Sequence, residues 1–354
     1  MKALIHIILI KLSFGPGYRM RVWKKLSALI SNGMVLEDSL VVLQRQSARR
    51  RSFAASIFSN ILDHIASGRS LGIALAGYAT PAEIMLISSG QASNRLAETL
   101  QLSAELLEAR KKVVAAVTGA LAYPVFLTFL SFVVLFVVAV VLIPELSGIS
   151  DPTRWSGMAA ALYAISTFVT SPWGLVIFLI LCGLVFVSLS TMSIWTGSLR
   201  LYADKIPPWS IYRLTVGCVW LFTLTTLMRS GMQLGRVLEN MLDSKNTTPY
   251  LRERVQAILE HSRSGRNFGT AMDECGMNFP DIEIVDDIRV YSMALSTFNE
   301  RLYDIAKQSM ADGVDKIQRN ARVLNAVCMM LIIVQIICVV VSISSLQQQI
   351  LGGF

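Results

Sequence analysis

The sequence predicts an all-α fold: a polytopic membrane protein with three transmembrane helices and two homologous helical-bundle domains on the cytoplasmic side. Of its 354 residues, 53% are apolar and only 16% are charged, so the chain is more hydrophobic than an ordinary soluble protein. Three long windows lack any Asp, Glu, Lys, Arg or His, and the two polar regions beside them resemble each other. Lipid must therefore cover part of a duplicated helical chain.

The chain begins with residues 1–20, which we interpret as an amphipathic segment on or near the membrane. Residues 1–10 combine a Lys with a short apolar run, as a signal peptide would. No small-residue cleavage site follows, and five basic residues come next: Lys11, Arg19, Arg21, Lys24 and Lys25. The segment is therefore expected to be retained, ahead of a first helical domain over residues 21–118.

A second helical domain, residues 195–322, repeats the first at a nearly constant offset. One block recurs 198 residues later, where Leu26, Leu29, Gly33, Met34, Leu36 and Leu40 return as Leu224, Leu227, Gly231, Met232, Leu234 and Leu238. Another block, residues 61–74, recurs 197 residues later at residues 258–271. The leucines have the spacing of short amphipathic helices, so both domains are expected to share one helical fold.

Four glycines mark the turns between these helices: Gly33, Gly68, Gly231 and Gly265. Each follows a predicted helix, where glycine can adopt the left-handed conformation that ends it. Ser70 and its counterpart Asn267 can then cap the next helix by accepting backbone N–H bonds. We attribute the residues that the two copies share, Gly72 and Gly269 included, mainly to turn chemistry.

The three apolar windows are residues 119–143, 173–194 and 323–346. Each is long enough to cross about 30 Å of hydrocarbon as an α-helix. The first contains Pro124, which we expect to kink the span because proline cannot donate a helical hydrogen bond. Residues 347–354 follow the third span as a periplasmic tail.

Residues 144–172 connect the first two spans and are expected to be periplasmic or interfacial. Their mostly apolar part, residues 155–170, could be a fourth span. About 16 residues fall short of the roughly 20 that a span needs, and Ser156, Ser166 and Thr167 are polar. We therefore interpret residues 155–170 as an interfacial helix.

Long uninterrupted stretches join each domain to a span. Residues 92–143 contain only Gly119 and Pro124 as helix breakers, and residues 296–346 contain only Gly313. Continuous helices are therefore expected to run from each domain into the span that follows, and such helices would transmit movement stiffly.

The distribution of charge predicts the topology and locates the positive excess. Residues 1–118 carry 15 basic and 7 acidic groups, and residues 195–354 carry 16 and 15. The whole net charge of +8 thus lies in residues 1–118. With three spans, every basic residue near a span end except Arg154 falls on one side, so both domains are expected in the cytoplasm.

Exposed arginines are the candidate partner-binding residues. Arg49, Arg50 and Arg51 form a basic run that could dock an acidic surface, and a solvated helix junction explains the run equally well. Arg69 and Arg266 each follow a tight turn in equivalent places of the two copies, where exposure alone accounts for them.

No residue pattern predicts catalysis, a cofactor or a metal site. The chain lacks the phosphate-binding loop, the H-E-x-x-H zinc motif and the C-x-x-C pair. Residues 68–72 match the G-x-S-x-G nucleophile elbow, but their flanks are predicted helices and the second copy has Asn267 in place of Ser70. A metal site shared by His64 and His261 is an alternative to the buried or capping role that we prefer for both.

The charge distribution and the composition of the spans bear on two other functions, nucleic-acid binding and membrane transport. The positive excess is not interleaved with aromatic residues that stack bases, so no nucleic-acid partner is expected. A membrane transporter or permease would place ionisable groups or broken helices at mid-membrane, whereas these spans offer Asn325, Gln335, hydroxyls and Pro124. A transporter remains the alternative hypothesis.

Nearly the whole chain resembles the type II secretion F-domain family. Residues 26–40, LSALISNGMVLEDSL, resemble its opening helix-turn-helix, and residues 119–144 resemble its first span. Pro207 and Pro208 before the second copy also fit the family. One departure is the family's Gly-Glu-x-x-Gly motif, because residues 90–94 read Gly-Gln-Ala-Ser-Asn.

The resemblance implies a non-enzymatic platform protein of the bacterial inner membrane, at the base of a type IV pilus or type II secretion machine. The short N-terminus is similar to the compact type IVb or thin-pilus branch. Implied partners are a cytoplasmic hexameric ATPase, pilin or pseudopilin subunits, other inner-membrane assembly proteins and a second copy of the chain as a dimer. The family also implies about six short helices in each domain.

The charge distribution makes the topology testable by cysteine accessibility. In a chain stripped of its native Cys, a Lys245→Cys residue should react only with reagents that enter the cytoplasm, whereas Ser156→Cys should react from outside. Labelling of position 245 from the periplasmic side would overturn the three-span topology.

Overall fold

The computed structural model describes residues 13–148, 151–152, 155–206, 208–244, 247–292 and 298–351. Of the expected amphipathic segment, residues 1–12 lie outside these ranges, as do Pro207, Lys245 and the end of the tail. Residues 13–20 are described and belong to the first domain, where Phe14 and Arg19 are buried, so the domain extends before the predicted boundary at residue 21. The described residues form helices and no strand, so the all-α prediction is confirmed.

The chain divides into two compact units. Met1–Val114 and Ser193–Val314 make up the first, which we call the domain unit. Ala115–Met192 and Asp315–Phe354 make up the second, which we call the span unit. Each unit is described separately.

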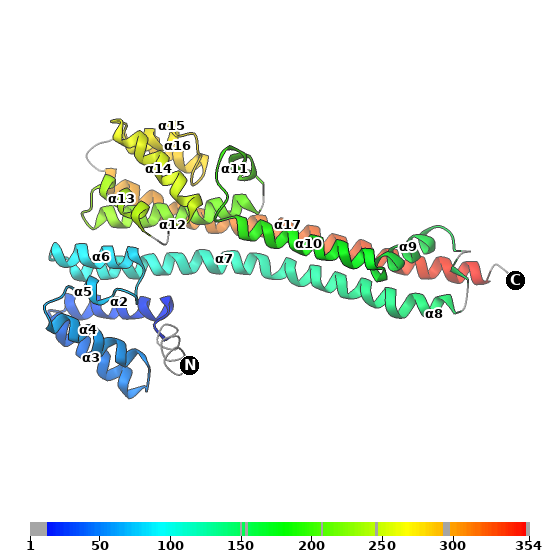
Figure 1. The fold of residues 1–354 in the computed structure, drawn as a ribbon, viewed down its shortest axis with the longest axis horizontal. Helices are drawn as coiled ribbons and strands as arrows, with labels where there is room; N and C mark the ends of the chain where they lie inside the picture. The colour runs from blue at the N-terminus through cyan, green and yellow to red at the C-terminus, as the bar shows by residue number, and fades with distance from the viewer. Residues whose placement is uncertain are drawn as a thin grey trace. The chain divides into compact units, whose positions relative to one another are not determined.

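The first copy within the domain unit has six helices among the described residues (Figure 1). They are α2 (Pro16–Ser31), α3 (Leu36–Arg49), α4 (Ala54–Ala66), α5 (Leu71–Ala74), α6 (Pro81–Ala92) and the start of α7 (Leu96–Val137). Pro16 suits the first turn of α2, where its missing N–H has no helical partner. Phe14, Trp23, Leu26 and Phe58 are buried together in the core of this copy.

The second copy repeats this order. Its described helices are α12 (Trp209–Arg229), α13 (Leu234–Asp243), α14 (Pro249–Arg263), α15 (Phe268–Glu274), α16 (Ile282–Tyr291) and the start of α17 (Phe298–Leu351). A further short helix, α11 (Ser198–Ala203), precedes them. The described residues thus give six helices in the first copy, as the family resemblance implied, and seven in the second when α11 is counted.

The predicted turns are confirmed at all four glycines. Their φ values are +86° at Gly33, +76° at Gly68, +97° at Gly231 and +83° at Gly265. Ser70 Oγ accepts a bond from the N–H of Ile73, and Asn267 Oδ1 accepts one from the N–H of Thr270, so both predicted N-caps form.

Turn chemistry does not explain Gly72 and Gly269, and there our attribution of the shared residues was wrong. A Cβ on Gly72 would lie 1.9 Å from Ser88 Oγ, and one on Gly269 would lie 2.5 Å from Arg289 Cα. These glycines instead allow α5 to approach α6, and α15 to approach α16.

The span unit contains the apolar part of the chain. Its helices are the rest of α7, the π-helical η1 (Val138–Leu142), α8 (Ile143–Ser147), α9 (Met158–Thr170), α10 (Pro172–Thr191) and the rest of α17. Inside this unit Gln335 Nε2 donates to the carbonyl of Ser131 at 3.1 Å, and Ser131 Oγ donates to Gln335 Oε1 at 2.5 Å. The two polar side chains therefore satisfy each other between α7 and α17.

Two continuous helices carry the chain from the domain unit into the span unit (Figure 1). α7 has 42 residues and α17 has 54, which confirms the expected long helices. Pro124 lies within α7, and the helix continues on both sides of it.

Three described helices are long and apolar enough to cross a membrane: Leu96–Ser147, Trp209–Arg229 and Arg301–Ser345. The first contains the predicted span 119–143, and the third contains nearly all of the predicted span 323–346. The other, α12, has Trp220, Leu221 and Leu224 buried by protein, so its apolar surface needs no lipid.

The second predicted span corresponds to α10. This 20-residue helix contains no Asp, Glu, Lys, Arg or His, and its Trp173, Leu184 and Phe186 are exposed. An outward-facing apolar surface of this kind requires lipid. The second span therefore stays a prediction, which α10 fits.

The apolar segment between the first two spans forms α9. It has 13 residues, about 20 Å of helix, which is too short to cross the hydrocarbon. Ala159 and Leu162 pack with Trp155, Val138 and Ile143. Ser342 of α17 also donates to the carbonyl of Met158 at 3.0 Å.

The close helix contacts predict that Gly269→Ala destabilises the second copy more than Gly72→Ala destabilises the first. The new methyl group at position 269 meets backbone, which cannot rotate away, whereas at position 72 it meets the Ser88 hydroxyl. Overpacking of this kind costs about 1–3 kcal/mol. Amide exchange in detergent should quicken across α15 and α16, and equal protection in both variants would contradict this account.

Candidate partner-docking surface

The predicted basic run lies at the junction between α3 and α4. Arg49 is the last residue of α3, Arg50 caps it, and all three arginines are exposed. Arg51 has φ +51°, the left-handed region that favours glycine. Its N–H donates to Ala48 O at 2.9 Å and the N–H of Ser52 donates to Ser47 O at 3.0 Å, which is a Schellman turn.

Further exposed basic residues flank this run. Arg21, Lys24 and Lys25 are exposed on α2, and Arg45 is exposed on α3. Lys25 Nζ donates to Gln46 Oε1, which brings the basic side of α2 beside α3. Gln46 and Arg50, like Arg21 and Lys25, are four positions apart and share a helix face. We call these residues the basic surface: Arg21, Lys24, Lys25, Arg45, Arg49, Arg50 and Arg51.

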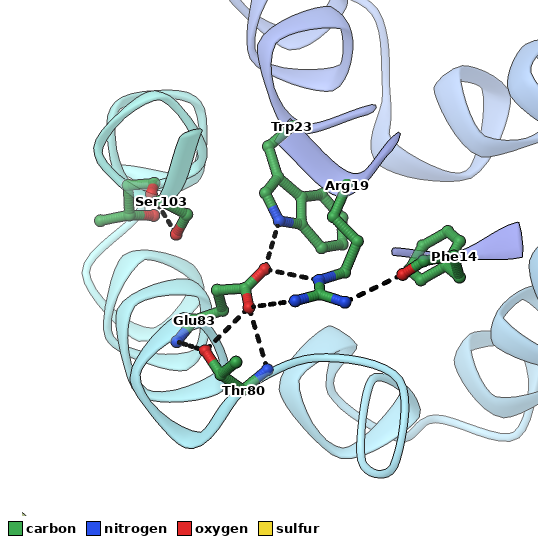
Figure 2. A network of polar contacts seen from close by, with 7 residues as sticks. Phe14, Arg19, Trp23, Thr80, Glu83 and Ser103 are labelled. Carbon is green, nitrogen blue, oxygen red and sulfur yellow. Dashed lines mark hydrogen bonds and ion pairs between the residues drawn. The ribbon is translucent and has the colours of Figure 1, made fainter. Parts of the chain in front are cut away.

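A buried carboxylate on α6 holds α2 in place (Figure 2). Glu83 is fully buried, and its oxygens accept bonds from Arg19 Nε at 3.0 Å and Arg19 Nη2 at 3.1 Å. Trp23 Nε1 donates to Glu83 at 2.8 Å. The backbone N–H and the hydroxyl of Thr80 donate at 3.0 and 2.8 Å, which completes a capping box at the start of α6.

These contacts determine the ionisation of Glu83. Burial raises the pKa of its carboxyl, but the bonds and charge of Arg19, with the bonds from Trp23 and Thr80, outweigh burial and lower the pKa below 4.5. Glu83 is therefore a carboxylate at neutral pH.

α3 is in turn tied to α2. The Tyr18 hydroxyl lies 3.0 Å from Ser47 Oγ, and Leu40 and Leu43 belong to the same buried core as Trp23 and Leu26. Exposed basic side chains therefore rest on two helices whose positions are fixed by burial and by Glu83.

The other two predicted arginines have local partners. Arg69 Nη1 lies 3.0 Å from His64 Nδ1, and Arg266 Nε lies 2.9 Å from Glu274. His261 Nδ1 lies 2.9 Å from the carbonyl of Ala257. Among the described residues, no group of three His, Cys, Asp or Glu side chains gathers as a metal site would require.

The second copy contains a buried polar network that sequence reasoning missed. Asp204 accepts bonds from Arg200 Nε at 2.9 Å, Arg254 Nη2 at 3.1 Å and the Tyr250 hydroxyl at 3.0 Å. Burial raises the pKa of Tyr250, so its hydroxyl stays protonated and donates. The spacing of four between Arg200 and Asp204 was a visible sign of this pair, and Thr-Pro-Ala-Glu at residues 80–83 was the sign of the capping box.

Comparison with protein families explains the duplication. Residues 24–144 and 220–346 each match the family model described as Type II secretion system (T2SS), protein F. The two matches cover more than half of the chain. The chain belongs to this family.

The family gives the general class of the protein. Its members are associated with the inner-membrane platforms of type II secretion and type IV pilus machines, rather than with enzymes, and work there with ATPases and pilins. The match confirms the resemblance seen in the sequence. No curated protein matched the chain.

The Glu83 network predicts that Glu83→Gln loosens the first copy. The substitution leaves Arg19 buried without its counter-charge, which typically costs about 3–5 kcal/mol. Faster amide exchange is expected in α2 and α6 of the detergent-solubilised chain. Glu108→Gln is the control, because its pair with Lys24 at 2.7 Å is exposed and contributes about 1 kcal/mol or less.

The same network makes the stability of the first copy depend on pH in the acid range. Folding lowers the pKa of Glu83, so ionised Glu83 adds to the free energy of unfolding. This contribution is fully present above the ordinary pKa of 4.5 and is lost as the pH falls through the pKa that Glu83 has in the folded protein. Glu83→Gln should remove this part of the acid sensitivity. Identical acid profiles for the two proteins would show that Glu83 is not the carboxylate that α2 depends on.

Proposed function

We propose that this protein is the inner-membrane platform of a type IV pilus or related secretion machine, and couples a cytoplasmic assembly ATPase to extraction and polymerisation of pilins. The continuity of α7 is the observation that carries the proposal. One helix begins at Leu96 in the first copy and extends through the apolar window, so force applied to the domain would reach the membrane without a flexible link.

The basic surface is the proposed dock for the ATPase. It lies in the copy that holds the positive excess, and its three junction arginines make no ion pair within the described part of the chain. Charge complementarity with an acidic partner would accelerate the encounter and make it sensitive to salt. The corresponding connection in the second copy, residues 244–248, carries a single basic residue.

The spans are proposed to guide pilin or pseudopilin subunits, beside other inner-membrane assembly proteins. The chain is proposed to act as a homo-oligomer, with a dimer as the favoured state. The bonds between Ser131 and Gln335 support a passive role for α7 and α17. In a membrane, such contacts are worth about 0.6 kcal/mol each and serve to pair helices. Because Gln335 is occupied by this pairing, it does not favour the alternative function of a transporter.

We expect charge reversal of Arg49, Arg50 and Arg51 to Glu to slow association with the purified partner ATPase by at least tenfold at low salt, and to abolish pilus assembly. The amount of protein in the membrane should not change, since exposed charges contribute little to folding. Stopped-flow or surface-based kinetics over a range of salt concentrations would measure the effect.

Two variants control this experiment. Lysines at positions 49, 50 and 51 keep the charge and should keep most of the association rate. Reversal of Arg252, Arg263 and Arg266, which are exposed on the second copy, changes the net charge equally and should have little effect. If only this second reversal weakens binding, the dock lies on the second copy and the proposed assignment is wrong.

A further inference from the structure

The short helix α11 buries its charged side chains and exposes its apolar ones, which is the reverse of a helix on a water-exposed surface. Its arginine, Arg200, is 0% exposed, whereas Leu199 is 72% and Tyr202 is 69% exposed. Ile194 before the helix and Ile206 after it are exposed as well. Within thirteen residues, the chain thus presents four large apolar or aromatic side chains outward.

The rotation of α11 is fixed by the contacts of Arg200. Its Nε donates to Asp204 Oδ1 at 2.9 Å, and its guanidinium lies 4.6 Å from the ring centre of Tyr250. The rings of Trp195 and Tyr212 each lie 5.7 Å from it. Arg200 and Asp204 are four positions apart and therefore occupy the same, inward side of the helix.

The outward side is consequently an apolar stripe. Leu199 and Tyr202 are three residues apart on one face of the helix, and the exposed Ile206 follows in the turn after it. Lys205 is exposed beside the stripe, and its Nζ lies 5.6 Å from the ring centre of Tyr202. An aromatic ring and a lysine at the edge of an apolar stripe are typical of residues at a membrane interface.

We infer that α11 lies in the headgroup region of the bilayer, with Leu199, Tyr202 and Ile206 directed toward the acyl chains. The inference rests on the proposed role of α10 as a span. α10 ends at Thr191 and α11 begins at Ser198. The seven residue steps from Thr191 to Ser198 span at most about 25 Å even when extended, so α11 cannot leave the neighbourhood of the membrane surface.

Lipid suits this surface better than a protein partner. The stripe is short, has a cationic edge, and follows the exposed apolar helix α10 in sequence after only six residues. An interfacial helix of this kind would anchor the beginning of the second domain at the bilayer surface. The second domain could then move only about this anchored end.

Depth-dependent fluorescence quenching tests the inference on the full chain. A Leu199→Cys residue, in a background without native Cys, is labelled with bimane and reconstituted into vesicles whose lipids carry a doxyl group near the headgroup or deep in the acyl chain. We expect strong quenching by the shallow doxyl and weaker quenching by the deep one. Tyr202→Cys should behave in the same way.

Two positions serve as matched controls. Ile73→Cys replaces a residue on α5 of the first copy whose exposure, 59%, equals that of Ile206, and it should not be quenched. Leu179→Cys on α10 has the same exposure and should be quenched most by the deep doxyl.

These controls separate the possible failures. Quenching at position 179 with none at position 199 would overturn the interfacial helix and leave the span intact. Disulfide crosslinking between two copies through position 199, without lipid quenching, would overturn it in favour of a dimer contact. If position 179 itself were not quenched, α10 would not be a span and the topology beneath the proposed function would be wrong.

Discussion

The buried carboxylate of Glu83 is the interaction on which the first copy depends. A carboxylate transferred from water into the protein interior is stable only when its oxygens are fully hydrogen-bonded and its charge is paired. Glu83 meets both conditions through Arg19, Trp23 and Thr80, which come from α2 and from the residue before α6. α2 and α6 must therefore be ordered together, and the exposed basic residues of α2 take their positions from this pairing.

The two copies kept the order of their helices and changed their polar interiors. An arginine early in the first helix pairs with an acidic residue at the start of the fifth helix in both. Arg19 and Glu83 are buried at 3.0 Å, whereas Arg213 and Asp281 are 3.5 Å apart and partly exposed. The second copy instead concentrates its buried charge at Asp204, between Arg200 and Arg254. Apolar packing evidently sets the common fold, and each buried ion pair stabilises one copy only.

Local chemistry explains what the sequence predicted and what it did not. Left-handed glycines such as Gly33, caps such as Ser70, and long helices without breakers are encoded by neighbouring residues. Glu83 and Arg19 are 64 positions apart, and only the folded chain brings them together. Composition separated α10 from α12, because α12 contains two arginines whereas α10 contains no Asp, Glu, Lys, Arg or His. What composition could not show is that α12 is covered by protein, whereas α10 exposes its side chains.

Arg51 lies at a turn position where the backbone conformation favours glycine rather than arginine. The turn after α3 has the same backbone bonds as the turn after α2, where Gly33 occupies the left-handed position. A residue with a side chain costs about 1 kcal/mol or more in that conformation, so glycine would satisfy the turn better. The arginine at this position is therefore not required by the backbone. Its side chain adds a third exposed positive charge to Arg49 and Arg50, and that charge is the property that the proposed docking surface uses.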